Sequence, residues 1–175
     1  MPKFIKFITI LTIIFSFSIQ NTLADIPYFI DFKKVLNEST AGKNAQTFLK
    51  NKLEKESKKF KETESNLRKE EQDLINKKKI ISNEEFQKKV TQLREKVAKL
   101  QKDKNKSFND IGKLRTSAKT QLLKALNPIL KTYMEKNNIR LILDKSSILL
   151  GDTKLDITTQ VIEILNKELK SLNLK

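Results

Sequence analysis

Five lysines and two large apolar residues lie close together near the middle of the chain, on both sides of a Ser-Asn dipeptide. Lysine ammonium groups attract anions at long range, and apolar side chains add short-range contact without a fixed geometry. Such a set can hold a negatively charged, partly apolar partner, but it pairs no nucleophile with a base. The candidate binding residues are Lys77, Lys78, Lys79, Ile80, Phe86, Lys88 and Lys89.

The residue types on which most catalytic and metal sites depend are absent. The chain has no His, Cys or Trp, which excludes Cys and His nucleophiles, His bases, thiol redox chemistry and Cys/His zinc sites. Composition leaves open a site built from carboxylates or lysine, but no such pair stands out from the solvated charges. We therefore predict a protein that is not an enzyme, with no catalytic residue, metal or cofactor.

After the first 24 residues, which contribute Lys3 and Lys6, the excess of positive charge is confined to the middle of the chain. The net charge is +15, and residues 43–83 hold 12 basic and 7 acidic residues, while residues 84–136 hold 14 and 6. The other residues after position 24 carry equal numbers of both signs. A basic surface predicts an anionic partner, namely nucleic acid, an anionic membrane or an acidic protein. The alternative interpretation is that the lysines only keep the helices soluble.

The first 24 residues are predicted to be a secretory signal peptide. Two lysines precede an apolar run at residues 7–19, and a short polar end carries Thr22 and Ala24 at the positions that a signal peptidase inspects. Cleavage is expected between Ala24 and Asp25. The run is shorter than the roughly 20 residues of a membrane-spanning helix, and an uncleaved anchor is the alternative. A bacterial signal of this kind delivers the chain to a periplasm.

Residues 43–136 are predicted to form an antiparallel helical hairpin, with its tip near residues 76–84. In the first helix an apolar residue recurs every seven positions from Leu53 to Ile81, and the other seam positions are mostly polar. Such a thin stripe can pack against one neighbouring helix but cannot build a core. The residues expected to hold the hairpin together are Phe60, Leu67, Leu93 and Val97.

The second helix is predicted to start at Ser82, which forms a capping box with Glu85. Apolar residues then recur at spacings of four and three from Phe86 to Leu100, before Lys104 interrupts the pattern. The resulting helix pairs naturally with the thin stripe of the first one.

The segments on either side of the arm, residues 25–42 and 137–175, are predicted to form a small β-containing body. Residues 26–32 have the β-branched and aromatic composition of a strand, and residues 37–42 form a polar connector. The predicted fold class is therefore α+β, mostly α, with a long helical arm on the body.

The C-terminal segment is predicted to contain a β-hairpin of residues 139–143 and 147–150, followed by a helix capped by Asp156. The apolar face of that helix comprises Val161, Ile162, Leu165, Leu169 and Leu172. A body of this size buries too little surface to be stable alone, so we expect strands from neighbouring copies to complete it. The residues assigned to this shared body are Ile30, Leu141, Leu143, Ile148 and Leu150.

Over essentially all of its mature length the chain resembles the Skp (OmpH) family of periplasmic chaperones. The resemblance is carried by Leu-Ile-Leu-Asp at 141–144, Leu-Asp-Ile-Thr at 155–158, Val-Ile at 161–162 and Phe-Ile-Asp at 29–31. It implies a homotrimer whose three arms enclose a cavity. It also implies ATP-independent holding of unfolded outer-membrane β-barrel proteins on their way across the periplasm.

Two other functions are compatible with part of the pattern. A polyanion-binding protein would use the lysines on phosphates, but arginine is scarce and no aromatic stacking platform accompanies the basic residues, so nucleic acid is not expected as a partner in vivo. Transient contact with anionic membrane lipid is a further partner that the basic surface allows. A coiled-coil scaffold would need a stronger seam and no flanking strands.

Overall fold

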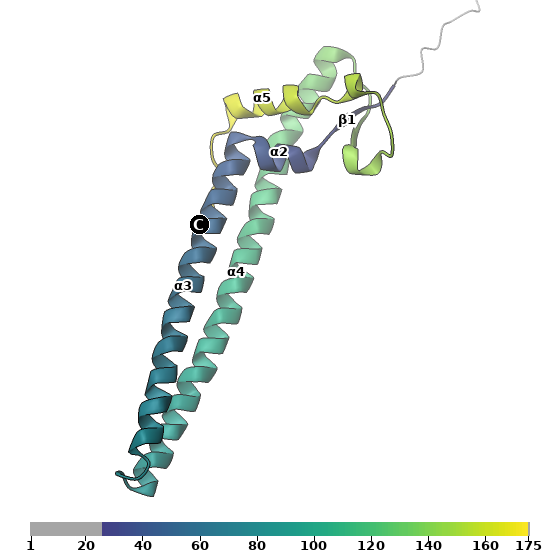
Figure 1. The fold of residues 1–175 in the computed structure, drawn as a ribbon. Coiled ribbons are helices and arrows are strands. Elements are labelled where there is room, and N and C mark those ends of the chain that lie inside the picture. The colour runs from purple at the N-terminus through teal and green to yellow at the C-terminus, as the bar shows by residue number, and fades with distance from the viewer. Residues whose placement is uncertain (1–25, 175) are drawn as a thin grey trace, which may run out of the picture.

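The computed structural model describes residues 26–174 as a long two-helix arm that projects from a small body (Figure 1). The arm consists of α3 (Thr40–Lys77) and α4 (Asn83–Asn137). The body contains β1 (Tyr28–Ile30), α2 (Phe32–Glu38), β2 (Ile142–Asp144), the 3₁₀ turns η1 (Lys145–Ser147) and η2 (Thr153–Leu155), and α5 (Thr158–Glu168). The predicted α+β class, mostly α, and the helical hairpin are confirmed. The predicted signal peptide and its cleavage site lie outside the described residues.

The two strands form a parallel pair that joins the two ends of the chain. Tyr28 pairs with Ile142 and Ile30 with Asp144, and an isolated parallel bridge links Phe29 to Asp156. Parallel strands need a long crossover connection between them, and here α2 and the whole α3–α4 hairpin form that crossover. The strand pair therefore holds the two ends of the helical hairpin together at the base of the arm.

The predicted β-hairpin of residues 139–143 and 147–150 is wrong. Only residues 142–144 form a strand, and they pair with β1 rather than with residues 147–150. The reason is local, because a carboxylate oxygen of Asp144 accepts a hydrogen bond from the backbone N–H of Ser146 at 2.8 Å. This interaction turns the chain into η1 immediately after the strand.

The N-terminal segment contains more helix than predicted. The strand expected at residues 26–32 is limited to Tyr28–Ile30, and most of the expected connector at residues 37–42 is helical. Two N-caps explain the difference: Asp31 accepts from the N–H of Lys34 at 2.8 Å, and the Ser39 hydroxyl accepts from the N–H of Gly42 at 3.1 Å. Each cap satisfies a free donor and starts a new helix.

The core of the body draws on both ends of the chain and on the base of α4. The predicted apolar face of the last helix is confirmed at Val161, Ile162 and Leu165, which are buried, while Leu169 and Leu172 follow the helix and pack against the core. The buried cluster comprises Ile30, Val35, Ala41, Leu122, Leu126, Ile129, Ile157, Val161, Ile162 and Leu165. The predicted cap at Asp156 is displaced by one residue: the N-cap of α5 is Ile157, which makes no side-chain cap, and Asp156 before it accepts a hydrogen bond from the Thr158 N–H at 3.0 Å.

A narrow apolar seam holds α3 against α4. Phe60 is buried, with its ring centroid 6.3 Å from that of Phe108 on the other helix. Leu67 and Leu93 are half-buried on facing helices, and Val97 lies at the edge of the seam with half of its surface exposed. The seam is thus as thin as the sequence predicts.

Two ion pairs cross the arm where the apolar pattern weakens. Lys104 Nζ donates to Glu64 Oε1, and Lys96 Nζ lies 2.6 Å from Glu70 Oε2. The Lys104 side chain is only 23% exposed, so Lys104 occupies the seam rather than leaving it. Its hydrogen bond and its positive charge lower the pKa of Glu64.

We expect Glu64→Gln to reduce the loss of stability in acid. Because the folded state lowers the pKa of Glu64, the ionised carboxylate stabilises the fold above its usual pKa of 4.5, and this contribution disappears as pH falls through the lower folded value. Between about pH 5 and pH 3 the wild-type protein should lose more stability than E64Q, as measured by urea unfolding followed by circular dichroism. Glu62→Gln, which removes an exposed carboxylate nearby, should retain the wild-type pH dependence. Identical profiles for all three proteins would contradict the prediction.

We also expect Gly42→Ala to destabilise the body. A Cβ at Gly42 would lie 2.1 Å from the carbonyl oxygen of Leu36, so α2 would have to move. Gly112 is the matched control, because a Cβ there meets nothing within 4 Å. Gly112→Ala should stabilise α4 by up to about 1 kcal/mol, the usual difference in helix propensity. Thermal unfolding should therefore shift in opposite directions, and an unchanged or raised midpoint for G42A would refute the close approach.

Candidate functional site

The candidate binding residues surround the tip of the arm. Helix α3 ends at Lys77, and α4 starts after Ser82, whose hydroxyl accepts a hydrogen bond from the N–H of Glu85 at 3.2 Å. The Ser82 half of the predicted capping box is therefore formed. Ile80 is 80% exposed in the turn, so it offers an apolar surface at the extremity of the arm.

The lysines of the tip differ in how they are held. Lys78 Nζ lies 5.7 Å from the centre of the Phe86 ring, a cation–π contact. Lys89 Nζ lies 3.3 Å from Glu85 Oε1. Lys77, Lys79 and Lys88 form no ion pair with any described residue. The structure thus brings all of the candidate residues to one end of the arm and leaves part of their charge available.

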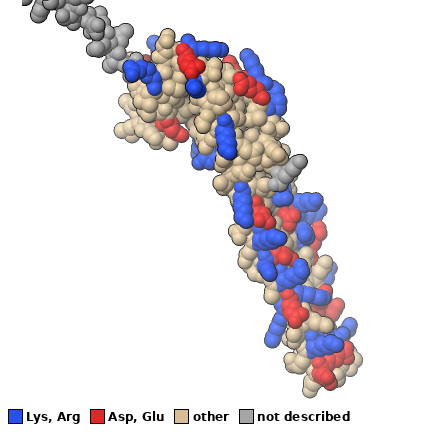
Figure 2. Space-filling view, turned by 180° about the vertical axis from the view of Figure 1, so that it is seen from behind, with Lys and Arg blue, Asp and Glu red and all other residues tan. Residues whose placement is uncertain are grey.

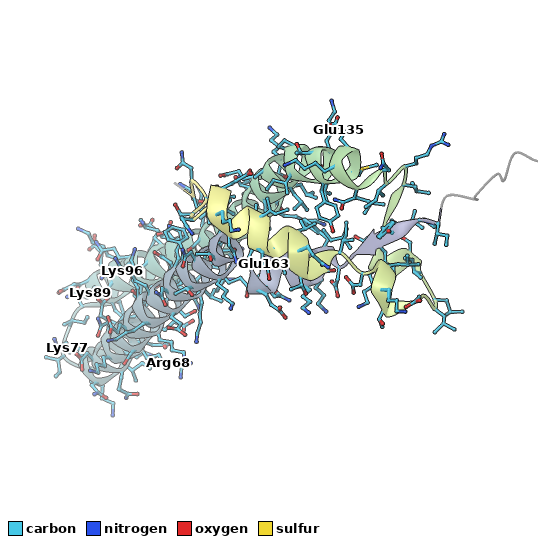
Figure 3. All side chains as sticks on the ribbon, turned by 90° about the horizontal axis from the view of Figure 1, so that it is seen from above. Arg68, Lys77, Lys89, Lys96, Glu135 and Glu163 are labelled. Atoms are coloured by element: carbon cyan, nitrogen blue, oxygen red, sulfur yellow. The ribbon has the colours of Figure 1, made fainter. Side chains whose placement is uncertain are left out.

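Basic and acidic side chains alternate along the arm, whereas a larger part of the body surface is neither (Figure 2). Viewed from above, Lys77, Lys89 and Lys96 lie along one side of the hairpin, and Arg68 lies on the other (Figure 3). Both sides of the arm therefore present cations to an approaching partner.

Large apolar side chains are also exposed on the arm, and two of them, Val97 and Phe108, belong to the seam. Those with more than a third of their surface exposed are Phe48, Leu53, Ile75, Ile80, Val97, Phe108 and Leu123. They are spread from the base to the tip and do not form one continuous patch. A long flexible partner could touch several of them at once, each with a small gain from buried area.

The residues assigned to a shared body lie in two environments. Ile30 is buried in the core of the single chain, and Leu143 and Ile148 are half-buried. Leu141 is exposed to 51% and Leu150 to 92%, beside the fully exposed Leu149. The body thus presents uncovered leucines next to the strand pair, a feature typical of an interaction surface.

A groove at the base of the arm is the main feature that the sequence did not predict. It measures about 820 Å³ and lies between α3 and α4, below α2. Leu53 and Ile111 belong to the apolar pattern of the helices, but their shared groove depends on how α2 and the C-terminal tail pack. The sequence signal that could have indicated it is the pair of small residues Gly42 and Ala45 near the start of α3, both of which line the groove.

The described residues contain no group of three or more His, Cys, Asp or Glu that could hold a metal ion. Within residues 26–174, no helix combines the length and the apolar character that a bilayer crossing requires.

Comparison with known proteins agrees with the architecture. A family model for OmpH-like outer membrane proteins matches residues 28–165. The crystal structure of a candidate OmpH-like outer membrane chaperone from Caulobacter crescentus superimposes with a TM-score of 0.79 and 19% sequence identity, covering 85% of this chain and 89% of that one. A search of curated proteins gave no significant match. The family match spans most of the chain, from β1 into α5, and so the chain belongs to the OmpH-like family.

Proposed function

We propose that this chain is an ATP-independent holding chaperone of the periplasm that binds unfolded outer-membrane β-barrel proteins and prevents their aggregation. The observation that carries the proposal is the surface of the arm. It combines an excess of lysine with separate exposed apolar side chains, on helices that need only a narrow seam for their own pairing. Family membership and the likeness to the Caulobacter crescentus structure support it.

The physical properties of such clients match this surface. A strand of an outer-membrane barrel alternates apolar and polar residues, and an acidic unfolded chain is attracted by a basic arm over the distance of the electrostatic field. Scattered apolar contacts then hold the chain without imposing a shape on it. Release needs no nucleotide, because folding of the barrel in the membrane supplies a more stable state.

We further propose that three copies assemble through the body. Leu141 directly precedes β2, and Leu149 and Leu150 follow the η1 turn after it, while the second edge of β2 has no strand partner among the described residues. An open strand edge with apolar neighbours is a ready site for pairing with another chain. Three arms from one body would surround a client on several sides.

The alternative of a polyanion-binding protein fits the arm less well. Glu64, Glu70 and Asp103 form ion pairs with lysines of the arm, and they would repel the phosphates of nucleic acid. A protein client with both charge signs and apolar side chains tolerates this mixture.

One prediction of the proposed function concerns the aggregation of a client. When a urea-unfolded outer-membrane β-barrel protein is diluted into buffer, the mature chain, residues 25–175, should suppress light scattering at about three chains per client, one trimer each. Suppression should weaken with added salt, because exposed charges are screened. A chain that fails to suppress scattering at any ratio would refute the chaperone function.

Reversing the charge of the five tip lysines, Lys77, Lys78, Lys79, Lys88 and Lys89, tests their share in the same assay. This variant should capture the client more weakly than the wild-type protein, and its salt dependence should be smaller. Unchanged capture would remove these lysines from the client-binding surface.

A further prediction of the proposed function concerns the assembly of three copies. The double variant Leu149→Ser, Leu150→Ser should dissociate a trimer into smaller species, because it removes apolar area that the trimer would bury. Ile80→Ser is the control, since it removes an apolar side chain that is 80% exposed at the far end of the arm. Light scattering coupled to size-exclusion chromatography gives the mass of each protein. A wild-type monomer, or a double variant of unchanged mass, would contradict the proposed interface.

A further inference from the structure

The groove at the base of the arm has an apolar floor, in which Leu53 is the large apolar residue with substantial exposed surface. Leu49 and Ile111 are buried in the floor, while Leu53 keeps 37% of its surface exposed at the open side. The groove follows α3 from Gly42 to Leu53, which at 1.5 Å per residue is about 17 Å. An extended polypeptide rises 3.2–3.4 Å per residue, so about five residues fit this length.

Small residues line part of the groove. Ala45 and Ala118 line it from the two helices, while the position of a Cβ at Gly42 is occupied by the Leu36 backbone of α2. Its upper end is closed by Leu36 of α2 and by Leu172 of the C-terminal tail. A nearby hydrogen bond from Gln46 Nε2 to Leu36 O, 3.2 Å long, holds α2 over this end.

The rim of the groove is cationic and contains no carboxylate. Lys50, Arg115 and Lys119 line it, and its other polar residues are uncharged. Among the described residues, neither Arg115 nor Lys119 takes part in an ion pair. Lys50 lies 3.8 Å from Glu54, but its side chain is 74% exposed, so this pair neutralises little of the rim.

The other hollows along the arm are different. The groove beside Leu67 contains Arg68 and Arg94 together with Glu64 and Glu71. The hollow nearer the tip contains Glu70 and Asp73 beside its three lysines. Of the hollows described on the arm, the one at the base alone joins an apolar floor to a purely cationic rim.

We propose that this groove is a binding subsite for a short extended segment of a client polypeptide in which large apolar residues alternate with acidic ones. In an extended chain successive side chains point to opposite sides. The apolar side chains of the segment therefore point into the groove, towards Leu53 and the buried Leu49 and Ile111. The backbone and the acidic side chains remain near the cations of the rim, which are Lys50, Arg115 and Lys119. The proposal rests on the chaperone function above and deepens it by naming a place and a sequence pattern.

A peptide fits the groove better than a lipid does. The site is open along its length, and its three cations are distributed over both helices rather than gathered at one end. A single-chain lipid with an anionic head would place one charge at one point and would need its acyl chain enclosed. An anionic amphiphile is therefore the competing occupant that the experiment must distinguish.

The experiment measures fluorescence anisotropy of labelled nine-residue peptides titrated with the mature chain. The main probe alternates leucine with aspartate, and two comparison probes replace the aspartates by lysine or the leucines by serine. The groove variant is Arg115→Gln with Lys119→Gln. The matched control is Lys154→Gln with Lys167→Gln, which removes the same charge from two exposed positions of the body.

The wild-type protein should prefer the leucine–aspartate probe over both comparison probes. The groove variant should weaken binding of that probe about tenfold, by loss of two charge contacts in a partly apolar site, and the body control should weaken it less than about twofold. Leu53→Gln, which keeps the charge and changes an exposed position, should also weaken binding. If the groove variant loses helicity in circular dichroism, Leu53→Gln replaces it as the test of binding in the groove.

Equal losses in the groove variant and the body control would overturn the proposal, because general charge alone would then account for binding. Displacement of the probe by low concentrations of dodecyl phosphate, without any preference among the three peptides, would overturn it in favour of an anionic amphiphile. The aggregation assay distinguishes a failure of the groove proposal from a failure of the chaperone function. A wild-type chain that suppresses aggregation while the groove variant binds peptide normally refutes only the groove, whereas a wild-type chain that binds peptide but never suppresses aggregation refutes the chaperone function.

Discussion

The pairing of β1 with segments from the other end of the chain is the interaction on which the rest of the structure depends. β1 hydrogen-bonds to β2 on one side and bridges to Asp156 on the other. Directly after it, the N–H of Asp31 donates to the hydroxyl of Thr158, 127 positions away, at 2.9 Å. Because these contacts fix both ends of the hairpin at its base, the arm itself needs only a thin seam. The helix surface that a wider apolar seam would bury therefore remains exposed and carries lysines and isolated apolar side chains.

The fixed base and the thin seam together keep the two helices aligned and leave most of the arm surface free. Phe60, Leu74 and Leu100 are buried along the seam, but between them Lys104 and Glu64 occupy seam space with a charge pair. A buried or half-buried pair of this kind fixes the register of two helices more than it adds to their stability. The arm can therefore keep its alignment while little buried area opposes bending or opening near the tip.

The sequence was a good guide wherever a repeated local signal existed. The spacing of seven from Leu53 to Ile81 and the Ser82 cap located the two helices and the tip, and the apolar face of α5 was correct at Val161 and Leu165. The short strands were harder, because a run such as Ile139 to Leu143 indicates a strand but not its partner. The predicted antiparallel hairpin failed for this reason, and the parallel pairing with β1 depends on contacts that no local pattern encodes.

The caps at Asp31 and Ser39 were not predicted, because the aromatic residues before Asp31 favoured a longer strand and the polar segment around Asn37 favoured a connector. The candidate tip was predictable because charge and turn signals coincide there. The groove at the base was not, because its residues come from both helices and from the tail around Leu172. A site formed where several elements meet has no signature within any one of them.

The positions of the tip and of the proposed groove also bear on how a client would be held. Charge acts over a Debye length of roughly 8–10 Å at ordinary ionic strength, whereas apolar contact acts only when surfaces touch. Exposed lysines at the end of a long arm therefore favour the first encounter, and an apolar groove beside the body favours retention of a segment already drawn inward. If both operate, affinity rises from the tip towards the base, and a client is held away from other clients near the body without being bound tightly at any single point. Such a gradient requires the arm to be long, its tip to remain polar and its base to be rigid, and these are the three properties that the strand pairing and the thin seam together provide.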